Sequence, residues 1–192
     1  MGELPGYDPT RLPEDLPSPV DDGAADHLLG RRVPALTLPA TSGDPLDLSV
    51  LTGRTVVYAY PRTGRPDEAP LVEDWDTIPG ARGCTPESCA FRDHYAELRA
   101  AGAGVVGLST QDPDYQREAA TRLHLPYPLL SDADLALTRA LDLPTFEAAG
   151  QVLLRRLTLL VRDGVVEHVW YPVFPPDSHP QEVLSWLLSN PR

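Results

Sequence analysis

The sequence predicts an α/β fold, with a mixed central sheet flanked by helices and an antiparallel hairpin near the C-terminus. A strand, a helix and a second strand follow one another between residues 55 and 109, the order of two parallel strands joined by a helix. Asp163-Gly164, a strong hairpin signal, separates two apolar stretches in the last third of the chain. The 192 residues, 42% of them hydrophobic and 23% charged, are enough for one globular domain with its own core.

The strand predictions rest on apolar patterns. An alternation over residues 33–38 and a continuous apolar run at 55–60, stopped by Pro61, are typical of strands. A second run at 104–109 is predicted to pair in parallel with the first. Two longer apolar stretches, about 152–161 and 165–173, form the predicted hairpin.

The helix predictions rest on capping residues. Thr85 as N-cap, Pro86 at the first helical position and apolar residues at helical spacing predict a helix to about Ala101. Asp112 is expected to cap a helix over about 113–123. Capping boxes also predict a short helix after residues 131–134 and a closing helix after residues 178–181. The thioredoxin fold is the common small architecture with this order of elements.

The charge of the chain excludes some functions. The net charge is −12, and all 16 basic residues are Arg. A phosphate backbone would be repelled, so nucleic-acid binding is disfavoured. Since the sequence shows neither a secretory leader nor a membrane-length apolar run, we expect a cytoplasmic protein that does not bind membranes.

Two stretches depart from the globular pattern. Residues 1–27 hold five Pro and seven acidic residues against one Arg, which indicates an acidic, Pro-rich N-terminal extension that is flexible or draped over the surface. Residues from about 62 to 83 read as an inserted loop, rich in Pro, Gly and acids, with an apolar plug that includes Trp75 and Ile78. The folded domain is expected to cover residues 28–192.

Cys84 lies at the start of a predicted helix, where unpaired backbone N–H groups and the helix dipole favour a thiolate. An ordinary thiol, with a pKa of about 8.5, is only about 3% thiolate at pH 7. Lowering the pKa by about two units takes roughly 2.7 kcal/mol, of which the helix dipole supplies about half. We therefore expect an Arg side chain near this sulfur.

Cys89 follows five residues later in the same predicted helix. In a helix the two cysteine Cα atoms would be about 9 Å apart and on different faces, whereas a disulfide needs about 7 Å or less. If the two cysteines react with each other, the first turns of the helix have to unwind. The spacing therefore predicts an order-to-disorder step coupled to oxidation.

Several motifs occur together in this chain. Gly83-Cys84-Thr85-Pro86-Glu87-Ser88-Cys89-Ala90-Phe91-Arg92-Asp93 comes after a buried strand that ends in Tyr60-Pro61, and it is followed by Gly107-Leu108-Ser109, Leu129-Leu130-Ser131-Asp132 and Arg156-Leu157-Thr158-Leu159-Leu160-Val161. In this combination the chain resembles, from about Leu28 onward, the bacterioferritin-comigratory, or Q-type, branch of the peroxiredoxins. The resemblance implies a thioredoxin-fold peroxiredoxin domain.

The resemblance also implies a thiol-dependent peroxidase for hydrogen peroxide and organic hydroperoxides, without a cofactor or metal and as a monomer. Cys84 would be the peroxidatic cysteine, and Cys89 the resolving cysteine that closes an intramolecular disulfide. Thioredoxin or a similar dithiol would reduce that disulfide. Arg156 matches the strand arginine of the family, which would supply the cation and orient the peroxide. Arg155 is expected to point to the opposite side of its strand.

The positions of the expected substrate-binding residues, relative to the peroxidatic cysteine, differ from those in the family. The family has a Pro seven residues and a Thr three residues before the peroxidatic cysteine, but this chain has Ala81 at the Thr position, and Pro61 stands 23 residues before the cysteine. Pro61 and Thr63 are the candidates for substrate binding, with Thr77 and Thr85 as other possible sources of the hydroxyl. The insert is hypothesised to fold over the cysteine as a lid.

Other interpretations of the cysteine pair stay open. The two residues are alternatively buried structural thiols or, with His94, part of a zinc site, although no second pair of ligands is evident. A thiol-disulfide oxidoreductase would instead carry Cys-x-x-Cys at the helix start. A non-catalytic redox sensor or binding module is the alternative from a different class. His27, His94 and His179 are expected to be partly exposed.

Overall fold

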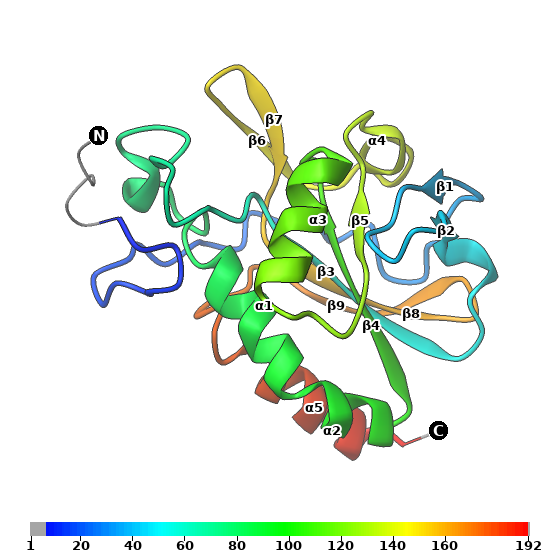
Figure 1. Cartoon of the computed structure of the whole chain (residues 1–192). Coiled ribbons are helices and arrows are strands. Elements are labelled where there is room, and N and C mark those ends of the chain that lie inside the picture. The colour runs from blue at the N-terminus through cyan, green and yellow to red at the C-terminus, as the bar shows by residue number, and fades with distance from the viewer. Residues whose placement is uncertain (1–6, 192) are drawn as a thin grey trace.

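The computed structural model describes residues 7–191, and a mixed five-stranded sheet forms the centre of this part of the chain (Figure 1). The strand order is β5-β4-β3-β8-β9. The parallel strands are β3 (Arg54–Ala59), β4 (Ala103–Ser109) and β5 (Leu129–Ser131), and the antiparallel ones are β8 (Leu157–Arg162) and β9 (Val165–Trp170). The predicted α/β fold with a mixed sheet and an antiparallel C-terminal hairpin is confirmed.

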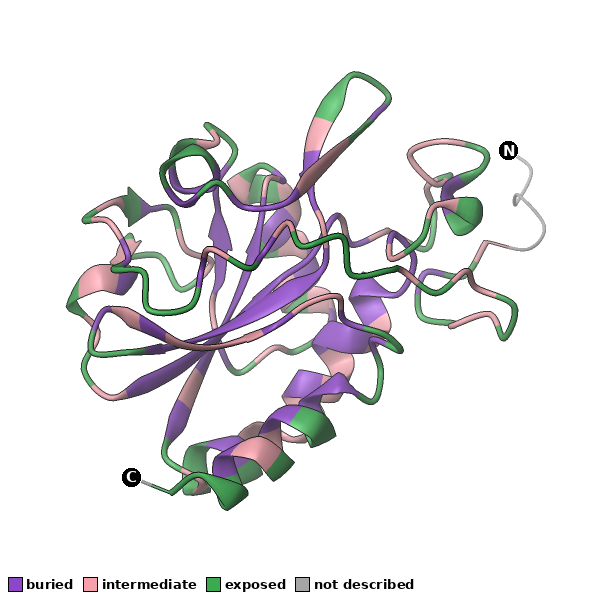
Figure 2. Ribbon diagram, turned by 180° about the vertical axis from the view of Figure 1, so that it is seen from behind, coloured by how far each residue is buried: buried purple, intermediate pink, exposed green. Residues whose placement is uncertain are grey.

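Helices lie on both faces of this sheet, and the strands β3, β4, β5 and β8 are almost entirely buried, whereas the edge strand β9 is only partly buried (Figure 2). One face packs against α1 (Cys84–Asp93), α2 (Tyr95–Ala100) and α5 (His179–Ser189), and the other against α4 (Ala136–Leu141) and apolar residues from Ala25 to Leu48. The helix α3 (Pro113–Arg122) packs against β5. None of these described helices has the length and apolar composition that crossing a bilayer requires.

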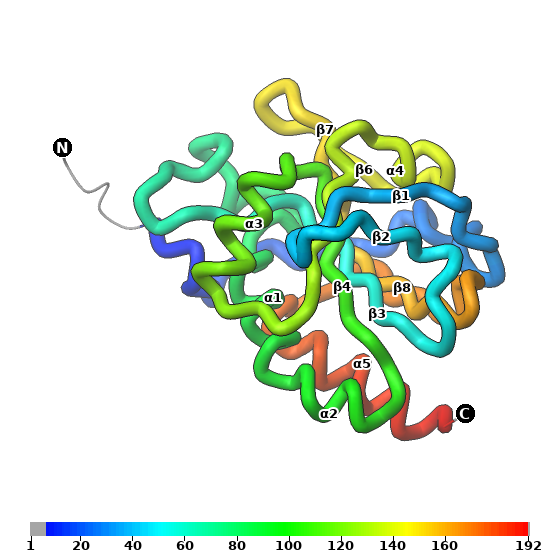
Figure 3. The backbone as a smooth tube through the Cα atoms, turned by 45° about the vertical axis from the view of Figure 1, so that its right-hand side comes forward, coloured from blue at the N-terminus to red at the C-terminus, as the bar shows by residue number. Residues whose placement is uncertain are grey.

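Two small hairpins lie outside the central sheet. β1 (Thr37–Leu38) pairs with β2 (Leu46–Asp47), which runs into the short 3-10 helix η1 (Leu48–Val50). β6 (Thr145–Ala148) pairs with β7 (Gln151–Leu154) in a hairpin that projects away from the sheet (Figures 1 and 3). The strands β5 and β6 were not predicted, because runs of three and four residues are too short to show a strand pattern.

The predicted helix after Thr85 differs from the structure at both ends. It begins at Cys84, with Gly83 as N-cap at a φ of 107°, a conformation that glycine adopts without strain. It also ends early, because His94 leaves the helical conformation and its Nδ1 lies 2.9 Å from the carbonyl oxygen of Ala90. The rest of the predicted helix is the separate α2.

The other caps are a mixture of confirmed and wrong predictions. Asp112 caps α3 as expected, since its carboxylate accepts the N–H of Tyr115 at 2.8 Å. The capping box at 131–134 is wrong: the Asp132 carboxylate instead accepts the N–H groups of Leu137 and Thr138, at 3.0 and 2.7 Å, so α4 begins later. Ser178 makes no side-chain cap bond to α5.

His179 is buried rather than partly exposed. Only 1% of it is accessible to solvent, because Nε2 lies 2.8 Å from the Thr158 hydroxyl on β8 and Nδ1 lies 3.1 Å from the Glu182 carboxylate. Its ring also meets Phe91 edge-on. His27 and His94 are partly exposed, as expected.

The predicted long strand at 152–161 is interrupted between β7 and β8. Arg155 and Arg156 occupy the interruption, so that β7 leaves the central sheet and pairs with β6. The two arginines are in different environments: Arg155 is partly exposed, 5.6 Å from the Phe146 ring, and Arg156 is buried. The prediction that Arg155 points to the opposite side of its strand is not met in that form, because neither arginine lies in a strand and both line one pocket.

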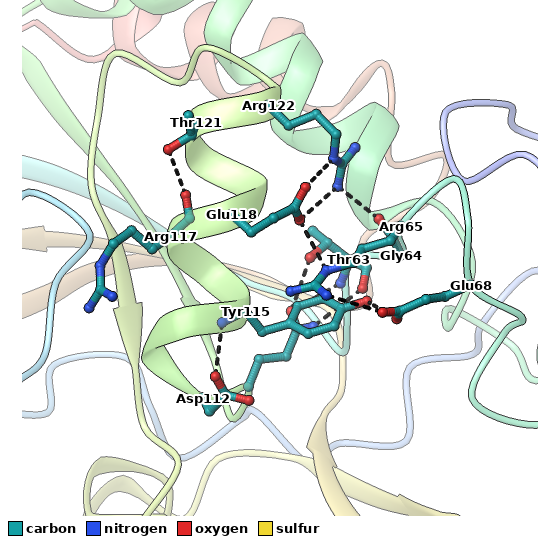
Figure 4. Close-up of polar contacts among 11 residues, drawn as sticks. Thr63, Gly64, Arg65, Glu68, Asp112, Tyr115, Arg117, Glu118, Thr121 and Arg122 are labelled. Carbon is teal, nitrogen blue, oxygen red and sulfur yellow. Dashed lines mark hydrogen bonds and ion pairs between the residues drawn. The ribbon is translucent and has the colours of Figure 1, made fainter.

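The insert is attached to the domain at two places. Its first part is held by α3 through ion pairs and hydrogen bonds (Figure 4), which involve Gly64, Arg65, Glu68, Tyr115, Glu118 and Arg122. Its apolar plug packs on the β6–β7 hairpin, where Trp75 in the 3-10 helix η2 (Trp75–Thr77) is 3% exposed and Ile78 is partly buried. Ala81 belongs to this same apolar cluster. The plug therefore fixes the chain just before Cys84.

The hairpin between β8 and β9 gives a test of local packing. Asp163 and Gly164 both have positive φ, 50° and 79°, and a Cβ on Gly164 would lie 2.7 Å from the backbone oxygen of Ser49. We expect Gly164→Ala to lower the free energy of unfolding by about 2–4 kcal/mol, from backbone strain plus overpacking. Gly150→Ala is the matched control, because Gly150 has a φ of 73° but no neighbour within 4 Å, and it should cost only about 1–2 kcal/mol. Equal losses in urea unfolding would contradict the steric argument.

Candidate active site

The sulfur of Cys84 lies where three segments meet. The guanidinium Nη2 of Arg156 is 3.1 Å from Sγ, and the backbone N–H of Arg62 points to Sγ at 3.4 Å. The thiol itself donates to the carbonyl oxygen of Ala81 at 3.6 Å. These contacts bring together the start of α1, the loop after β3 and the break between β7 and β8. The predicted Arg beside the sulfur is therefore observed.

The guanidinium of Arg156 is held through both of its terminal nitrogens, Nη1 and Nη2. Its Nη2 also lies 3.2–3.3 Å from the carbonyl oxygens of Gly80, Ala81 and Arg82. Its Nη1 is paired with the carboxylate of Glu87, one turn into α1. Arg156 is 3% exposed and Glu87 is fully buried. One cation thus ties the loop before Cys84 to the first turn of the helix.

Burial dominates the electrostatics of this site. It raises the pKa of the Cys84 thiol above its ordinary value, and Arg156 and the Arg62 N–H lower that pKa by less. The expectation of a lowered pKa is therefore wrong for this closed arrangement, because it considered the helix terminus and the cation but not the loss of water. Burial lowers the pKa of Arg156, but Cys84 and Glu87 raise it by more, so the guanidinium stays charged.

Cys89 lies in the same helix but in different surroundings. It is partly exposed, and both cysteines are free thiols in this structure. Burial raises the pKa of Cys89, while the nearby Arg92 lowers it. Since both residues belong to α1, the helical geometry keeps their Cα atoms about 9 Å apart, too far for a disulfide.

The two proposed substrate-binding residues lie close by in the loop after β3. Pro61 is buried and lies two residues beyond Ala59, where β3 ends. Thr63 is also buried, but its hydroxyl donates to Gln111 Oε1 at 3.2 Å and its N–H donates to the same oxygen at 3.1 Å. The Thr63 hydroxyl is thus engaged with Gln111 rather than with the sulfur.

Sequence reasoning missed two residues of this site, Arg62 and Glu87, and named a third, Thr85, as one of several possible sources of the hydroxyl. Arg62 contacts the Cys84 sulfur through its backbone N–H, and a pattern of side chains in the sequence cannot predict such a contact. The position of Glu87 could have been noticed in the sequence, because acidic residues are stabilised in the first turn of a helix. Its burial could not have been predicted. Thr85 has a buried hydroxyl that finds no hydrogen-bond partner among the described residues. Between residues 7 and 191, no group of three His, Cys, Asp or Glu side chains is placed to hold a metal ion.

Comparison with known proteins identifies the family. Residues 28–184 match the Redoxin family. The chloroplastic peroxiredoxin Q of Populus jackii is 35% identical over 161 residues, which cover 83% of this chain and 68% of that protein. The chain belongs to the Redoxin family, among the Q-type peroxiredoxins. The chloroplastic peroxiredoxin Q of Sedum lineare is 34% identical, again over 161 residues, covering 83% of this chain and 77% of the relative.

Solved peroxiredoxin structures agree with this assignment. The crystal structure of peroxidoxin BcpB from Mycobacterium tuberculosis superposes with a TM-score of 0.68 at 28% identity, covering 85% of this chain and 98% of the other. Peroxiredoxin Q from Xanthomonas campestris gives a TM-score of 0.63 at 25% identity, covering 92% and 98%. The thioredoxin-like fold and the peroxiredoxin resemblance are therefore confirmed, and they support a thiol-dependent peroxidase.

The charges around Cys84 predict opposite effects of two substitutions. Arg156→Ala removes the cation and should raise the pKa of the Cys84 thiol further, whereas Glu87→Gln removes a neighbouring negative charge and should lower it. The measurement is the pH dependence of Cys84 alkylation by iodoacetamide in the Cys89→Ser chain. A shift of the thiol pKa in the same direction for both variants would mean that these two charges do not control it.

Proposed function

We propose that this peroxiredoxin reduces hydrogen peroxide and organic hydroperoxides by a two-cysteine mechanism within one chain. The observation that carries the proposal is the 3.1 Å contact between the Cys84 sulfur and the buried guanidinium of Arg156 at the start of α1. A sulfur in that position has both a cation to favour its thiolate and oriented donors for a reacting oxygen.

In the first step, the Cys84 thiolate attacks one oxygen of the peroxide and the O–O bond breaks. The sulfur becomes a sulfenic acid, and the leaving alkoxide or hydroxide takes up a proton to give an alcohol or water. Negative charge moves from sulfur to the oxygens in this step. The Arg156 guanidinium and the Arg62 N–H, which both point to Sγ, are the groups that would stabilise that charge.

In the second step, the Cys89 thiol attacks the sulfenic acid, forming the disulfide and releasing water. The first turn of α1 has to unwind for this. The part next to Cys89 is well anchored, because the hydroxyls of Tyr58 and Tyr127 bond to Ser88 at 3.0 and 2.7 Å. Phe91 is stacked on the Tyr58 ring, with 4.4 Å between the centroids. We therefore infer that Cys84 moves toward Cys89.

In the third step, a dithiol such as thioredoxin returns both cysteines to thiols by disulfide exchange. The cytoplasm, which keeps dithiols reduced, is the proposed compartment. Since one chain holds both cysteines and the cation, a monomer suffices for the whole cycle.

Thr85 is a better candidate than Thr63 for the hydroxyl that contacts the peroxide. A buried hydroxyl without a partner is unfavourable by about 1–3 kcal/mol, and a peroxide oxygen would relieve that cost for Thr85. The hydroxyls of Thr63 and Thr77 already bond within the protein. We expect Thr85→Val to slow Cys84 oxidation about tenfold and Thr63→Val to slow it much less, measured as single-turnover oxidation by hydrogen peroxide. The reverse order would contradict this assignment.

Two cysteine substitutions test the mechanism. Cys84→Ser should abolish peroxide consumption, because the attacking sulfur is gone. Cys89→Ser should allow one turnover, ending in a sulfenic acid, and should block the disulfide. The measurement is intact mass of the reduced chain after one equivalent of hydrogen peroxide, with peptide mapping, followed by turnover with thioredoxin. Loss of two hydrogens without turnover would instead favour a redox sensor, and unimpaired turnover of Cys89→Ser would exclude its resolving role.

A further inference from the structure

Cys84 is only 2% exposed, and the N-terminal extension lies against the residues just before it in the chain, Arg82 and Gly83. Residues 7–12, here called the N-terminal strap, contact the two loops that flank the sulfur. In Figure 1 the extension, in blue, lies beside the insert and the start of α1. Neither the peroxidase chemistry nor the fold of the sheet explains why an acidic, Pro-rich segment should be placed there.

Tyr7 bridges the two flanking loops. Its ring lies under the guanidinium of Arg82, 4.6 Å from centroid to Cζ, and its hydroxyl is 3.0 Å from the position that a Cβ on Gly64 would take. Gly64 is two residues from Arg62, whose N–H points to the sulfur, and Arg82 is two residues from Cys84. The ring thus connects the loop after β3 with the loop before Cys84, and it is near enough for Cys84 to influence the pKa of the Tyr7 phenol, which burial raises.

Arg82 clamps the strap in place. It is 6% exposed, and its Nη2 donates to the backbone oxygens of Asp8 and Arg11 at 2.5 and 3.0 Å. Its Nη1 binds the carboxylate of Asp76 in the insert at 2.9 Å. One guanidinium therefore holds the strap and the insert against the loop that leads into Cys84.

Leu12 seats the strap on the first turn of α1. A Cβ on Gly83, the N-cap of that helix, would lie 2.9 Å from Leu12 Cδ1 and 2.5 Å from Pro176 Cγ. No space is left at this point between the strap and the helix start. Leu12 thus packs on the residue before Cys84, and Tyr7 packs on the loop that holds Arg62.

We propose that the strap is a roof over the peroxide entrance and that Tyr7 and Leu12 determine which peroxides reach Cys84, in favour of hydrogen peroxide over bulky aryl hydroperoxides. This inference rests on the proposed peroxidase function. The strap has no helix or strand. Two hydrogen bonds from the Arg82 side chain to its backbone oxygens and one cation–π contact hold it to Arg82, so it can open locally at small cost. Hydrogen peroxide needs only a small opening, whereas an aryl group needs the strap to be displaced.

The test compares two peroxides in single turnover. The reduced Cys89→Ser chain is mixed with hydrogen peroxide or cumene hydroperoxide, and the Cys84 sulfenic acid is trapped with dimedone and quantified by mass. Truncating both roof side chains, Tyr7→Ala with Leu12→Ala, should raise the ratio of the cumene hydroperoxide rate to the hydrogen peroxide rate about tenfold, a size typical of a hydrophobic gate. Each single substitution should give part of that change.

Two control variants separate the roof from general effects. Tyr7→Phe keeps the ring over Arg82, so the rate ratio should stay unchanged. Asp22→Asn weakens the bond from the Tyr171 hydroxyl at the other end of the extension, 2.9 Å long, and should also leave the ratio unchanged. An unchanged ratio in the double variant would overturn the roof. If no variant, nor the parent chain, reacts with either peroxide faster than free cysteine, the proposed peroxidase function fails instead.

Discussion

Moving a guanidinium out of water is unfavourable by several kcal/mol unless charged and polar partners surround it. Arg156, at 3% exposure, has such partners: the Cys84 sulfur, the Glu87 carboxylate and the carbonyl oxygens of residues 80–82. Because a missing partner would leave a buried charge unpaired, these groups form one cooperative unit. The unit fixes the loop before Cys84 and the first turn of α1 together, and it makes the position of the sulfur a consequence of the break between β7 and β8.

The proposed chemistry asks the same helix to be firm at one end and mobile at the other. Around Ser88 and Phe91, α1 is anchored by aromatic packing and by two tyrosine hydroxyls, and these contacts do not depend on the redox state of Cys84. Around Cys84 the contacts are mostly polar and involve the sulfur itself. When the reacting thiolate becomes a sulfenic acid, the negative charge that attracts Arg156 is lost. Oxidation therefore weakens the contacts of the end that must unwind and leaves the other end intact.

The sequence predicted the parts of the molecule that local patterns control. Continuous apolar runs fixed β3 and β4, Asp163-Gly164 fixed the β8–β9 turn, and Cys84 was placed correctly at a helix start. What escaped prediction depends on distant contacts. The 3-residue strand β5 forms by pairing with β4. The early end of α1 at Asp93 coincides with the contact between the His94 ring and the carbonyl oxygen of Ala90.

The same limit applies to the site. Arg156 was found through the family resemblance, not from its own strand pattern, because a buried Arg at a strand break looks like any other Arg in sequence. The direction of the Cys84 pKa was missed for a related reason. Helix position is visible in the sequence, whereas the burial of Cys84 is produced by segments far away in the chain, such as the apolar residues Val173, Val183 and Leu187 of its cluster.

Burial links access to reactivity in this molecule. The cover over Cys84 keeps water away, and the loss of water is the main cause of the raised thiol pKa. Any opening that admits a peroxide also admits water, and hydration favours the thiolate, since Arg156 and the Arg62 N–H already act in that direction. Closed, the site protects its sulfur as a neutral thiol. When the site opens, the thiolate forms and the peroxide can enter. A roof that is bonded to Arg82, two residues from Cys84, is therefore well placed to control both thiolate formation and peroxide access.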